Sequence, residues 1–388
     1  MKVLVAPDKF AGTLTAREAA DAIAEGWLRT CPADEVVRVP LADGGPGFLD
    51  ALESTLGGRR VRLEVTGPLG LPVAASVLVV EGTAYVESAE ACGLHLVPDD
   101  LRDPVRTTTY GVGELVAAAV AEGVGRIVVG LGGSATNDAG MGMLAALGAT
   151  AEGAEGLDVT ALLAEGASSL RSVVSVDLAP ARAAVAGVAL VMASDVDNPL
   201  LGLRGAANGF ARQKGADDAA VMELEGTLEH LVDVVGRRPD GKDPAVALGA
   251  GAAGGLGYAL LHLDAERVPG IATVLGTVGF DGLVSDADVV VTGEGAFDWQ
   301  SLRGKVVSGV AEAALGQGRA CVVLAGRVEV GRREYAATGV SGAYAVVDDL
   351  RDRGVPEADA LVRPAEHLAA LAERAARTWG GTARVEGA

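Results

Sequence analysis

The chain has 388 residues, a formal net charge of −20 and 49% apolar residues. This length is enough for two or three domains with sizeable cores. The negative charge disfavours nucleic acid and anionic membranes as partners. The three cysteines lie far apart and lack C-x-x-C spacing, so they indicate neither a disulfide framework nor a zinc site.

Short Val/Ile/Leu runs, each followed by a Gly- or Asp-bearing loop and then a helical pattern, recur along the chain. The runs cover residues 3–6, 36–39, 126–130, 189–193, 288–292, 321–325 and 343–347. This alternation predicts an α/β fold with a mainly parallel sheet, whose strands are covered on both faces. The chain enters the first run without a charged, apolar leader, so we expect a cytoplasmic protein.

Two helices and one hairpin have clear local signals. Thr15 and Glu18 form a T-x-x-E capping box before the first helix, and an apolar stripe predicts a helix over residues 217–235. The runs 73–80 and 83–87 flank Glu81 and Gly82, which is typical of a β-hairpin. A hairpin inside a parallel pattern indicates that a second domain begins near residue 61.

Two loops near the N-terminus follow predicted strands and carry polar groups. Asp8 and Lys9 place a carboxylate beside an ammonium at the expected sheet edge, although a solvated charge pair would have the same sequence. Asp43, Gly44 and Gly45 let backbone approach a ligand, but they also suit an ordinary turn.

The loop at residues 130–140 is the strongest candidate for anion binding. Gly132 and Gly133 allow N–H groups to converge on an anion, and the hydroxyls of Ser134 and Thr136 can donate to phosphate oxygens. Asn137 extends this polar loop. Asp138 can hold Mg²⁺ or cap the following helix. The loop is not a Walker A sequence, and a Gly-rich turn with an Asn/Asp cap is the alternative.

Two later loops add candidate ligands. After the run at 189–193, Asp195 and Asn198 can bind Mg²⁺ or accept a hydroxyl proton, although an Asx-type turn explains them nearly as well. After the run at 288–292, Glu294 lies between Gly293 and Gly295 and can coordinate a metal ion.

Farther along that last loop, Lys305 can neutralise a transferring phosphoryl group, unless it is a solvated surface lysine. Residues 249–254 match G-x-G-x-x-G literally, but no strand precedes them, and a close-packed helix is the better interpretation.

Taken together, these motifs resemble the type I glycerate kinases over about residues 1–375. The similarity rests on APDKFxGTLTA (6–16), ADGG (42–45), GLGGSATNDAG (130–140), SDVDNPLLG (194–202), QKGA (213–216), AGGLG (253–257) and TGEGxxDxQSLRGK (292–305).

The resemblance implies phosphorylation of D-glycerate by ATP and Mg²⁺, at the 2-hydroxyl in preference to the 3-hydroxyl. It also implies a Rossmann-like parallel-sheet domain (1–60 and 280–388), an inserted α/β domain with a mixed sheet (61–279), and a cleft between them. A homo-oligomer is left open.

On this hypothesis, residues of the matched motifs divide the work of phosphoryl transfer. The 130–140 loop, Gly293 and Gly295 bind ATP, and Mg²⁺ is shared with Asp138, Asp195 or Glu294. Lys9, Arg303 or Lys305 hold the glycerate carboxylate or the γ-phosphoryl group, with Gly44, Gly45 and Asn198 at the substrate. Asp8, Asp43 or Asp195 accept the hydroxyl proton.

The sequence departs from the commoner family pattern at Ala11, Pro46, Phe48 and Ala296, which makes the acceptor less certain than the reaction class. A kinase of another small hydroxy or sugar acid is therefore one alternative. A non-catalytic nucleotide-binding regulator is a second, and a nucleotide-dependent oxidoreductase, based on residues 249–254 alone, is a third.

Overall fold

The computed structural model describes residues 1–10 and 12–380, so Ala11 lies outside the described residues. The chain forms two compact units. Unit 1 comprises Met1–Asp43, Asp50–Leu56 and Ile271–Ala388, and unit 2 comprises Gly44–Leu49 and Gly57–Gly270. The helices α2 (Phe48–Leu56) and α10 (Gly270–Thr277) contain border residues of the two units.

Unit 1 contains a five-stranded sheet of order β13-β12-β11-β1-β2, in which every neighbouring pair is parallel. Its strands are β1 (Lys2–Val5), β2 (Glu35–Arg38), β11 (Val289–Phe297), β12 (Ala320–Val328) and β13 (Val340–Ala345). The predicted parallel sheet is confirmed. The prediction of cover on both faces is wrong for β2, an edge strand whose Glu35 and Arg38 are exposed.

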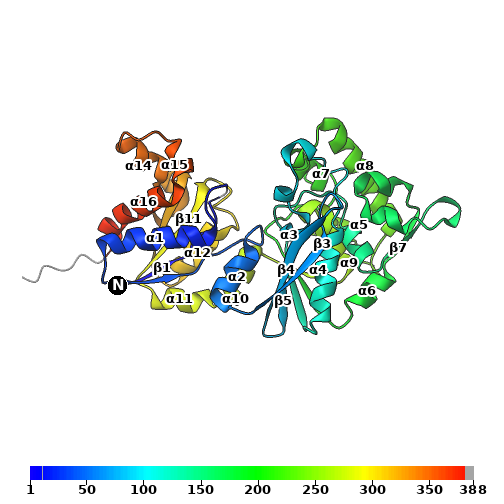
Figure 1. Cartoon of the computed structure of the whole chain (residues 1–388), viewed down its shortest axis with the longest axis horizontal. Helices are drawn as coiled ribbons and strands as arrows, with labels where there is room; N and C mark the ends of the chain where they lie inside the picture. Colours follow the sequence, from blue (N-terminus) through cyan, green and yellow to red (C-terminus); the bar gives the residue numbers. More distant parts are fainter. Residues whose placement is uncertain (11, 381–388) are drawn as a thin grey trace, which may run out of the picture. The chain divides into compact units, whose positions relative to one another are not determined.

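Helices cover both faces of the unit 1 sheet. They are α1 (Ala16–Thr30), α11 (Phe280–Asp286), α12 (Val306–Gly316), α13 (Arg332–Ala336), α14 (Val346–Asp352), α15 (Asp359–Val362) and α16 (Pro364–Trp379). Figure 1 shows α1 and α16 side by side, and their buried Ile23, Trp27 and Leu371 join one apolar cluster with β1 and β12. The predicted capping box before α1 is confirmed, since Glu18 N–H donates to Thr15 Oγ1 at 3.2 Å.

Unit 2 contains a six-stranded mixed sheet of order β10-β9-β6-β5-β4-β3. Its strands are β3 (Arg59–Thr66), β4 (Pro72–Val80), β5 (Thr83–Glu87), β6 (Arg126–Gly130), β9 (Ala189–Ala193) and β10 (Glu266–Val268), and β7 (Thr150–Glu152) pairs separately with β8 (Ser175–Asp177). The predicted hairpin is confirmed as β4 and β5, with positive φ angles at Glu81 and Gly82. Strand β3 was not predicted, although the alternating Val61, Leu63 and Val65 are a signal for it in the sequence.

The unit 2 helices pack on this sheet around a large apolar core. They are α3 (Ala89–Cys92), α4 (Tyr110–Ala121), α5 (Met141–Ala146), α6 (Ala179–Ala184), α7 (Ala206–Phe210), α8 (Asp218–Val235) and α9 (Leu256–His262). The predicted helix over 217–235 is confirmed as α8, which Asp217 caps by accepting from Ala220 N–H at 2.8 Å. None of the helices within residues 1–10 and 12–380 is long and apolar enough to cross a membrane.

Candidate active site

Charged side chains of unit 1 gather where its parallel strands end. This unit 1 charge cluster consists of Asp8, Lys9, Asp43, Glu294 and Lys305. Two backbone hydrogen bonds tie its loops together: Asp8 N–H donates to Gly293 O at 2.8 Å, and Leu41 N–H donates to Pro7 O at 2.9 Å. The carboxyl ends of parallel strands meet at one sheet edge, the usual place for ligands in open α/β folds.

The pKa shifts in the unit 1 charge cluster show how closely its members interact. Burial, followed by the Asp43 carboxylate, raises the pKa of Asp8 to about 6, while the Lys9 and Lys305 ammonium groups oppose the rise. Burial raises the pKa of Glu294 to about 7, and the Asp8 carboxylate adds to that shift. Since such effects fall off with distance, these groups lie close together.

Glu294 has an unused acceptor inside the protein. Its Oε1 atom is buried and accepts no hydrogen bond from the residues that the structure describes. A buried carboxylate oxygen without a donor is costly unless a ligand or ion completes it. Glu294 is therefore the residue of unit 1 best suited to hold a cation.

The loop from β11 to α12 places the remaining unit 1 candidates. Asp298 accepts from Gln300 N–H at 2.7 Å and from Ser301 N–H at 3.2 Å, which fixes the turn. The guanidinium of Arg303 lies 5.7 Å from the ring centroid of Trp299. Lys305 is the N-cap residue of α12, where the free N–H groups of the first turn favour anions.

In unit 2, the glycine-rich loop after β6 packs directly on the loop at residues 44–47. A Cβ atom on Gly132 would lie 2.6 Å from Gly45 Cα, so only glycine allows the two backbones to pass this closely. Glu87 accepts from the N–H groups of Gly47 and Leu49 at 3.1 and 3.2 Å, which anchors the second loop. The structure thus brings together Gly44, Gly45, Gly132 and Gly133, as the sequence analysis expected of one site.

Asp138 has a structural position in this loop. It is fully buried, and its two carboxylate oxygens accept from Thr109 N–H and Thr109 Oγ1 at 2.8 Å each and from Gly140 N–H at 3.0 Å. Burial raises the pKa of Asp138 against the effect of these donors. Because the donors already surround both oxygens, this geometry favours a loop-holding role over metal coordination.

The segment at residues 249–254, which matches G-x-G-x-x-G, packs against the backbone of the loop at residues 130–140. Gly254 has a φ of +70°, and a Cβ atom there would lie 1.8 Å from Thr136 O. Residues 252–255 form a short 3₁₀ turn before α9, with no strand immediately before them. The glycines of this motif thus provide close backbone packing, and nothing in their geometry corresponds to a dinucleotide-binding turn.

Lys214 contacts this loop and was not among the predicted site residues. Its ammonium group is buried and donates to Thr136 O at 2.7 Å and Ser134 Oγ at 3.0 Å, with Asn137 Oδ1 at 3.4 Å. Burial lowers the pKa of Lys214 to about 8. The signal was present, because Lys214 lies in the QKGA motif and is one of only five lysines in the chain.

A cavity of about 310 Å³ opens beside this loop, lined by Gly132, Gly133, Ser134, Gln213 and Lys214. Asn137 is fully buried, and its Nδ2 donates to no described residue. The glycine backbone, the hydroxyl of Ser134 and the cation of Lys214 in its lining give this cavity the character of an anion site.

Asp195 and Asn198 follow β9, the neighbour of β6 in the sheet. Asp195 Oδ1 accepts from Gly270 N–H at 2.9 Å, and Asn198 Nδ2 donates to Arg204 O at 2.6 Å. Neither bond is the local contact of an Asx-type turn, because Gly270 lies 75 residues from Asp195 and Asn198 acts as a donor, to a carbonyl six residues away. The two bonds hold the loop and do not exclude ligand contact. No group of three or more His, Cys, Asp or Glu side chains that could hold a metal occurs among the described residues.

Each unit has a feature that a small-molecule phosphotransferase needs: unit 1 has carboxylates and ammonium groups at a parallel sheet edge, and unit 2 has a glycine-rich loop suited to an anion. The family model described as the glycerate kinase family matches residues 3–380. The chain belongs to the glycerate kinase family, whose enzymes phosphorylate an alcohol group.

Several known proteins are similar to this chain. A glycerate kinase of Bacillus subtilis (strain 168) is 40% identical over 97% of this chain and 96% of its own length. The glycerate 2-kinase of Escherichia coli (strain K12) is 38% identical over 90% of this chain and 91% of its own.

A solved structure is also similar to the chain. The crystal structure of a protein provisionally named glycerate kinase 2, from Salmonella typhimurium LT2, matches with a TM-score of 0.79 and 35% identity. The match covers 97% of this chain and 98% of that one. The predicted family and the mixed α/β fold are therefore confirmed.

Proposed function

We propose that the protein transfers the γ-phosphoryl group of ATP to the 2-hydroxyl of D-glycerate, giving ADP and 2-phosphoglycerate. The unit 1 charge cluster carries this proposal, since it joins a candidate base, a candidate cation ligand and two ammonium groups at one sheet edge. The similarity to a glycerate 2-kinase supports the 2-hydroxyl over the 3-hydroxyl.

The residues fit a magnesium ion at Glu294. Mg²⁺ prefers carboxylate oxygens and keeps several waters, so one or two protein carboxylates suffice. The buried, unused Oε1 of Glu294 supplies one, and the Asp8 carboxylate lies near enough to affect its pKa. When bound, the ion neutralises charge on the phosphate oxygens of ATP.

Asp8 is the proposed general base. A carboxylate with a pKa of about 6 accepts a proton near neutral pH better than an unperturbed aspartate would. The glycerate hydroxyl oxygen bonds to the γ-phosphorus, its proton passes to the carboxylate, and the bond from phosphorus to the β–γ bridging oxygen breaks. Lys9 and Lys305 stabilise the charge that the departing oxygen gains. Asp43 supports the base by raising its pKa.

In unit 2, we propose that Gly132, Gly133, Ser134, Thr136 and Asn137 bind an anionic group, either a phosphate of ATP or the glycerate carboxylate. Gly44 and Gly45 complete the loop surface, and Asp195 and Asn198 are proposed substrate contacts of this unit. Arg303 is a proposed substrate contact of unit 1. The hydroxyl of Ser134 accepts from Lys214, which leaves its own O–H available to donate.

Incubation of the pure protein with Mg-ATP and D-glycerate, followed by ³¹P NMR, tests this function. We expect ADP and a phosphomonoester with the chemical shift and proton coupling of 2-phosphoglycerate. The Glu294→Gln variant should bind nucleotide more weakly in the presence of Mg²⁺ and form little product. A protein that forms no phosphoglycerate, or equally good turnover by Glu294→Gln, would contradict the proposal.

A further inference from the structure

Unit 1 also contains a cavity, and none of the roles proposed so far uses it. It has a volume of about 570 Å³ and opens at the ends of β11 and β12, against α14 and α15. This volume lies in the usual range for small-molecule sites. Apolar groups supply much of the wall, among them Phe10, Val347 and Leu361.

The cavity is continuous in sequence with the unit 1 charge cluster. Phe10 follows Lys9 directly in the loop after β1, and Gly295 and Ala296 follow Glu294 within β11, so one loop and one strand end both line the cavity and carry the charges. The Phe10 ring also lies near Gly293, because a Cβ built there would be 3.4 Å from Phe10 Cζ. A ligand in this cavity therefore has the charged groups within reach of an extended tail.

The charge around the cavity restricts the part of a ligand that fits it. Glu329 and Glu357 line it, against a single cation, Arg327. Such a rim repels phosphate but accepts the N–H groups of an exocyclic amine. Glycerate is too small and too polar for these apolar walls, whereas a planar base can pack against the side chains of Val347 and Leu361.

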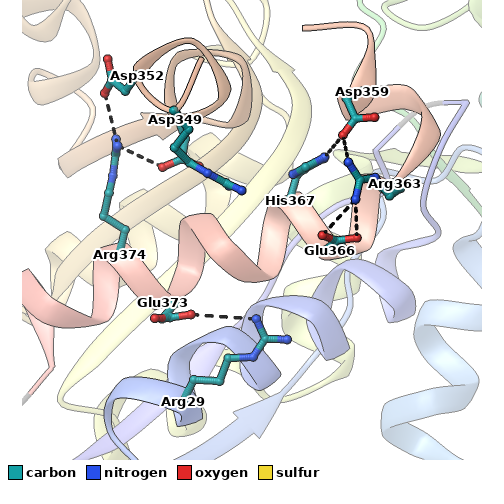
Figure 2. Close-up of polar contacts among 10 residues, drawn as sticks. Arg29, Asp349, Asp352, Asp359, Arg363, Glu366, His367, Glu373 and Arg374 are labelled. Carbon is teal, nitrogen blue, oxygen red and sulfur yellow. Dashed lines mark hydrogen bonds and ion pairs between the residues drawn. The ribbon is translucent and has the colours of Figure 1, made fainter. Parts of the chain in front are cut away.

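One wall of the cavity is held in place by ion pairs, shown in Figure 2. The wall consists of α15 and the residues just before it. Asp359 Oδ2 in α15 accepts from Arg363 and contacts His367 Nε2 at 2.7 Å. His367 belongs to α16 and is buried, so it fixes α15 to the long helix. The wall is therefore preorganised although Leu361 itself is 70% exposed.

We propose that this cavity binds the adenosine part of the phosphoryl donor, with the base between Val347 and α15 and the phosphates directed toward Lys9 and Lys305. The inference rests on the proposed use of ATP. It adds a nucleoside site to unit 1 and assigns α15 as its wall.

Photolabelling with 2-azido-ADP tests the location directly in the full chain. After irradiation and proteolysis, we expect the label on peptides that contain Phe10, residues 326–329 or residues 357–368, and excess ADP should suppress it. Label confined to peptides of unit 2 would overturn the inference. Failure of the proposed function would look different, because the wild-type protein would then give no phosphoglycerate in the ³¹P experiment.

Filling the cavity gives a second test by equilibrium binding. Ala358→Trp and Ala296→Trp introduce bulk from the helix wall and from the strand wall at exposed positions, so both variants should fold. We expect each to weaken ADP binding by about tenfold or more. Ala337→Trp, at an exposed position outside the cavity, should leave the ADP Kd unchanged. Unchanged ADP affinity in both folded cavity variants would refute the site.

Discussion

Lys214 illustrates how one buried cation can order a loop. Its ammonium group donates to the loop at Ser134 and Thr136 and adds positive charge behind the N–H groups. This geometry makes Lys214 a positioning residue. Its charge is also sensitive to pH, because burial brings the pKa down to about 8.

We expect Lys214→Met to lower stability by about 1–3 kcal/mol, because buried acceptors lose their donor. Affinity for anionic substrate should fall as well. In the wild-type protein this affinity should decline as the pH rises through about 8, since Lys214 then loses its proton. Isothermal titrations between pH 7 and 9 measure the decline, which Lys214→Met should lack.

Lys242→Met is the matched control for this prediction, because the Lys242 side chain is 75% exposed. It should leave both stability and affinity unchanged. Equal pH dependence in the wild-type protein and Lys214→Met would assign the titration to another group.

Glu294 predicts that the stability of the metal-free protein also declines as the pH rises, but in a lower pH range. Burial raises the pKa of Glu294 in the folded state to about 7 from its ordinary value of 4.5, so the folded state binds more protons between these two values. Its stabilising effect is therefore complete below pH 4.5 and is lost as the pH rises through about 7. The slope for one proton is at most about 1.4 kcal/mol per pH unit.

Urea denaturation in EDTA at several pH values checks this prediction. Glu294→Gln should flatten the curve between pH 5 and 7, but Asp8 keeps part of it because burial raises its pKa in the same direction. If the stability of Glu294→Gln depends on pH as steeply as that of the wild-type protein, Glu294 does not titrate between pH 5 and 7.

Among the structural elements, the turn at residues 252–255 sets the position of the glycine-rich loop. We expect Gly254→Ala to destabilise unit 2 by at least about 2 kcal/mol, because the new Cβ would overlap Thr136 O and the φ of +70° is strained. Gly125→Ala is the control, since its Cβ would meet no atom within 4 Å. Denaturant unfolding compares the two, and similar losses would contradict the packing argument.

The small helix α15 allows a prediction about the proposed nucleoside site. Asp359→Asn should weaken the link to His367 and Arg363 and raise the KM for ATP several-fold, with kcat and the KM for glycerate unchanged. Asp352→Asn is the matched control. Asp352, the last residue of α14, pairs with Arg374 of α16 (Figure 2) and does not line the cavity. Steady-state kinetics distinguish the two variants. A change in kcat alone in Asp359→Asn would contradict the role of α15 as the wall of the proposed nucleoside site.

The regular elements could be predicted from the sequence because their signals are local. The T-x-x-E box predicted the start of α1, and a strand occurs at each of the seven predicted apolar runs. The prediction that Gly293, Glu294 and Gly295 follow a strand is wrong, because β11 continues through them to Phe297. The end of β13 differs by two residues, because Val346 and Val347 open α14 and do not extend the strand. An apolar run alone does not distinguish a buried strand from the first turn of a buried helix.

The contacts of the candidate site could be predicted only in part, because many are long-range. Lys214 lies 80 residues from Ser134, and Thr109 lies 29 from Asp138, so no local pattern links them. The sequence did indicate which loops follow strand ends, and in each unit the parallel topology brings such loops to one edge.

In the whole molecule, each unit has its own apolar core. Leu371 of α16 belongs to the unit 1 core and Leu228 of α8 to the unit 2 core, and both side chains are 0% exposed. The two cores lie in separate compact units, so we expect calorimetry to resolve two unfolding transitions. Leu371→Ala should lower one transition by about 2–5 kcal/mol, and Leu228→Ala should lower the other by a similar amount.

Ligand linkage assigns these transitions to the units. On the proposed nucleoside site, ADP should raise the transition that Leu371→Ala lowers, because a ligand stabilises the unit that binds it. Inorganic phosphate, if it binds the glycine-rich loop, should raise the transition that Leu228→Ala lowers. A single transition that both variants shift equally would mean that the two cores unfold as one cooperative block, and ADP acting only on the Leu228-sensitive transition would move nucleotide binding to unit 2.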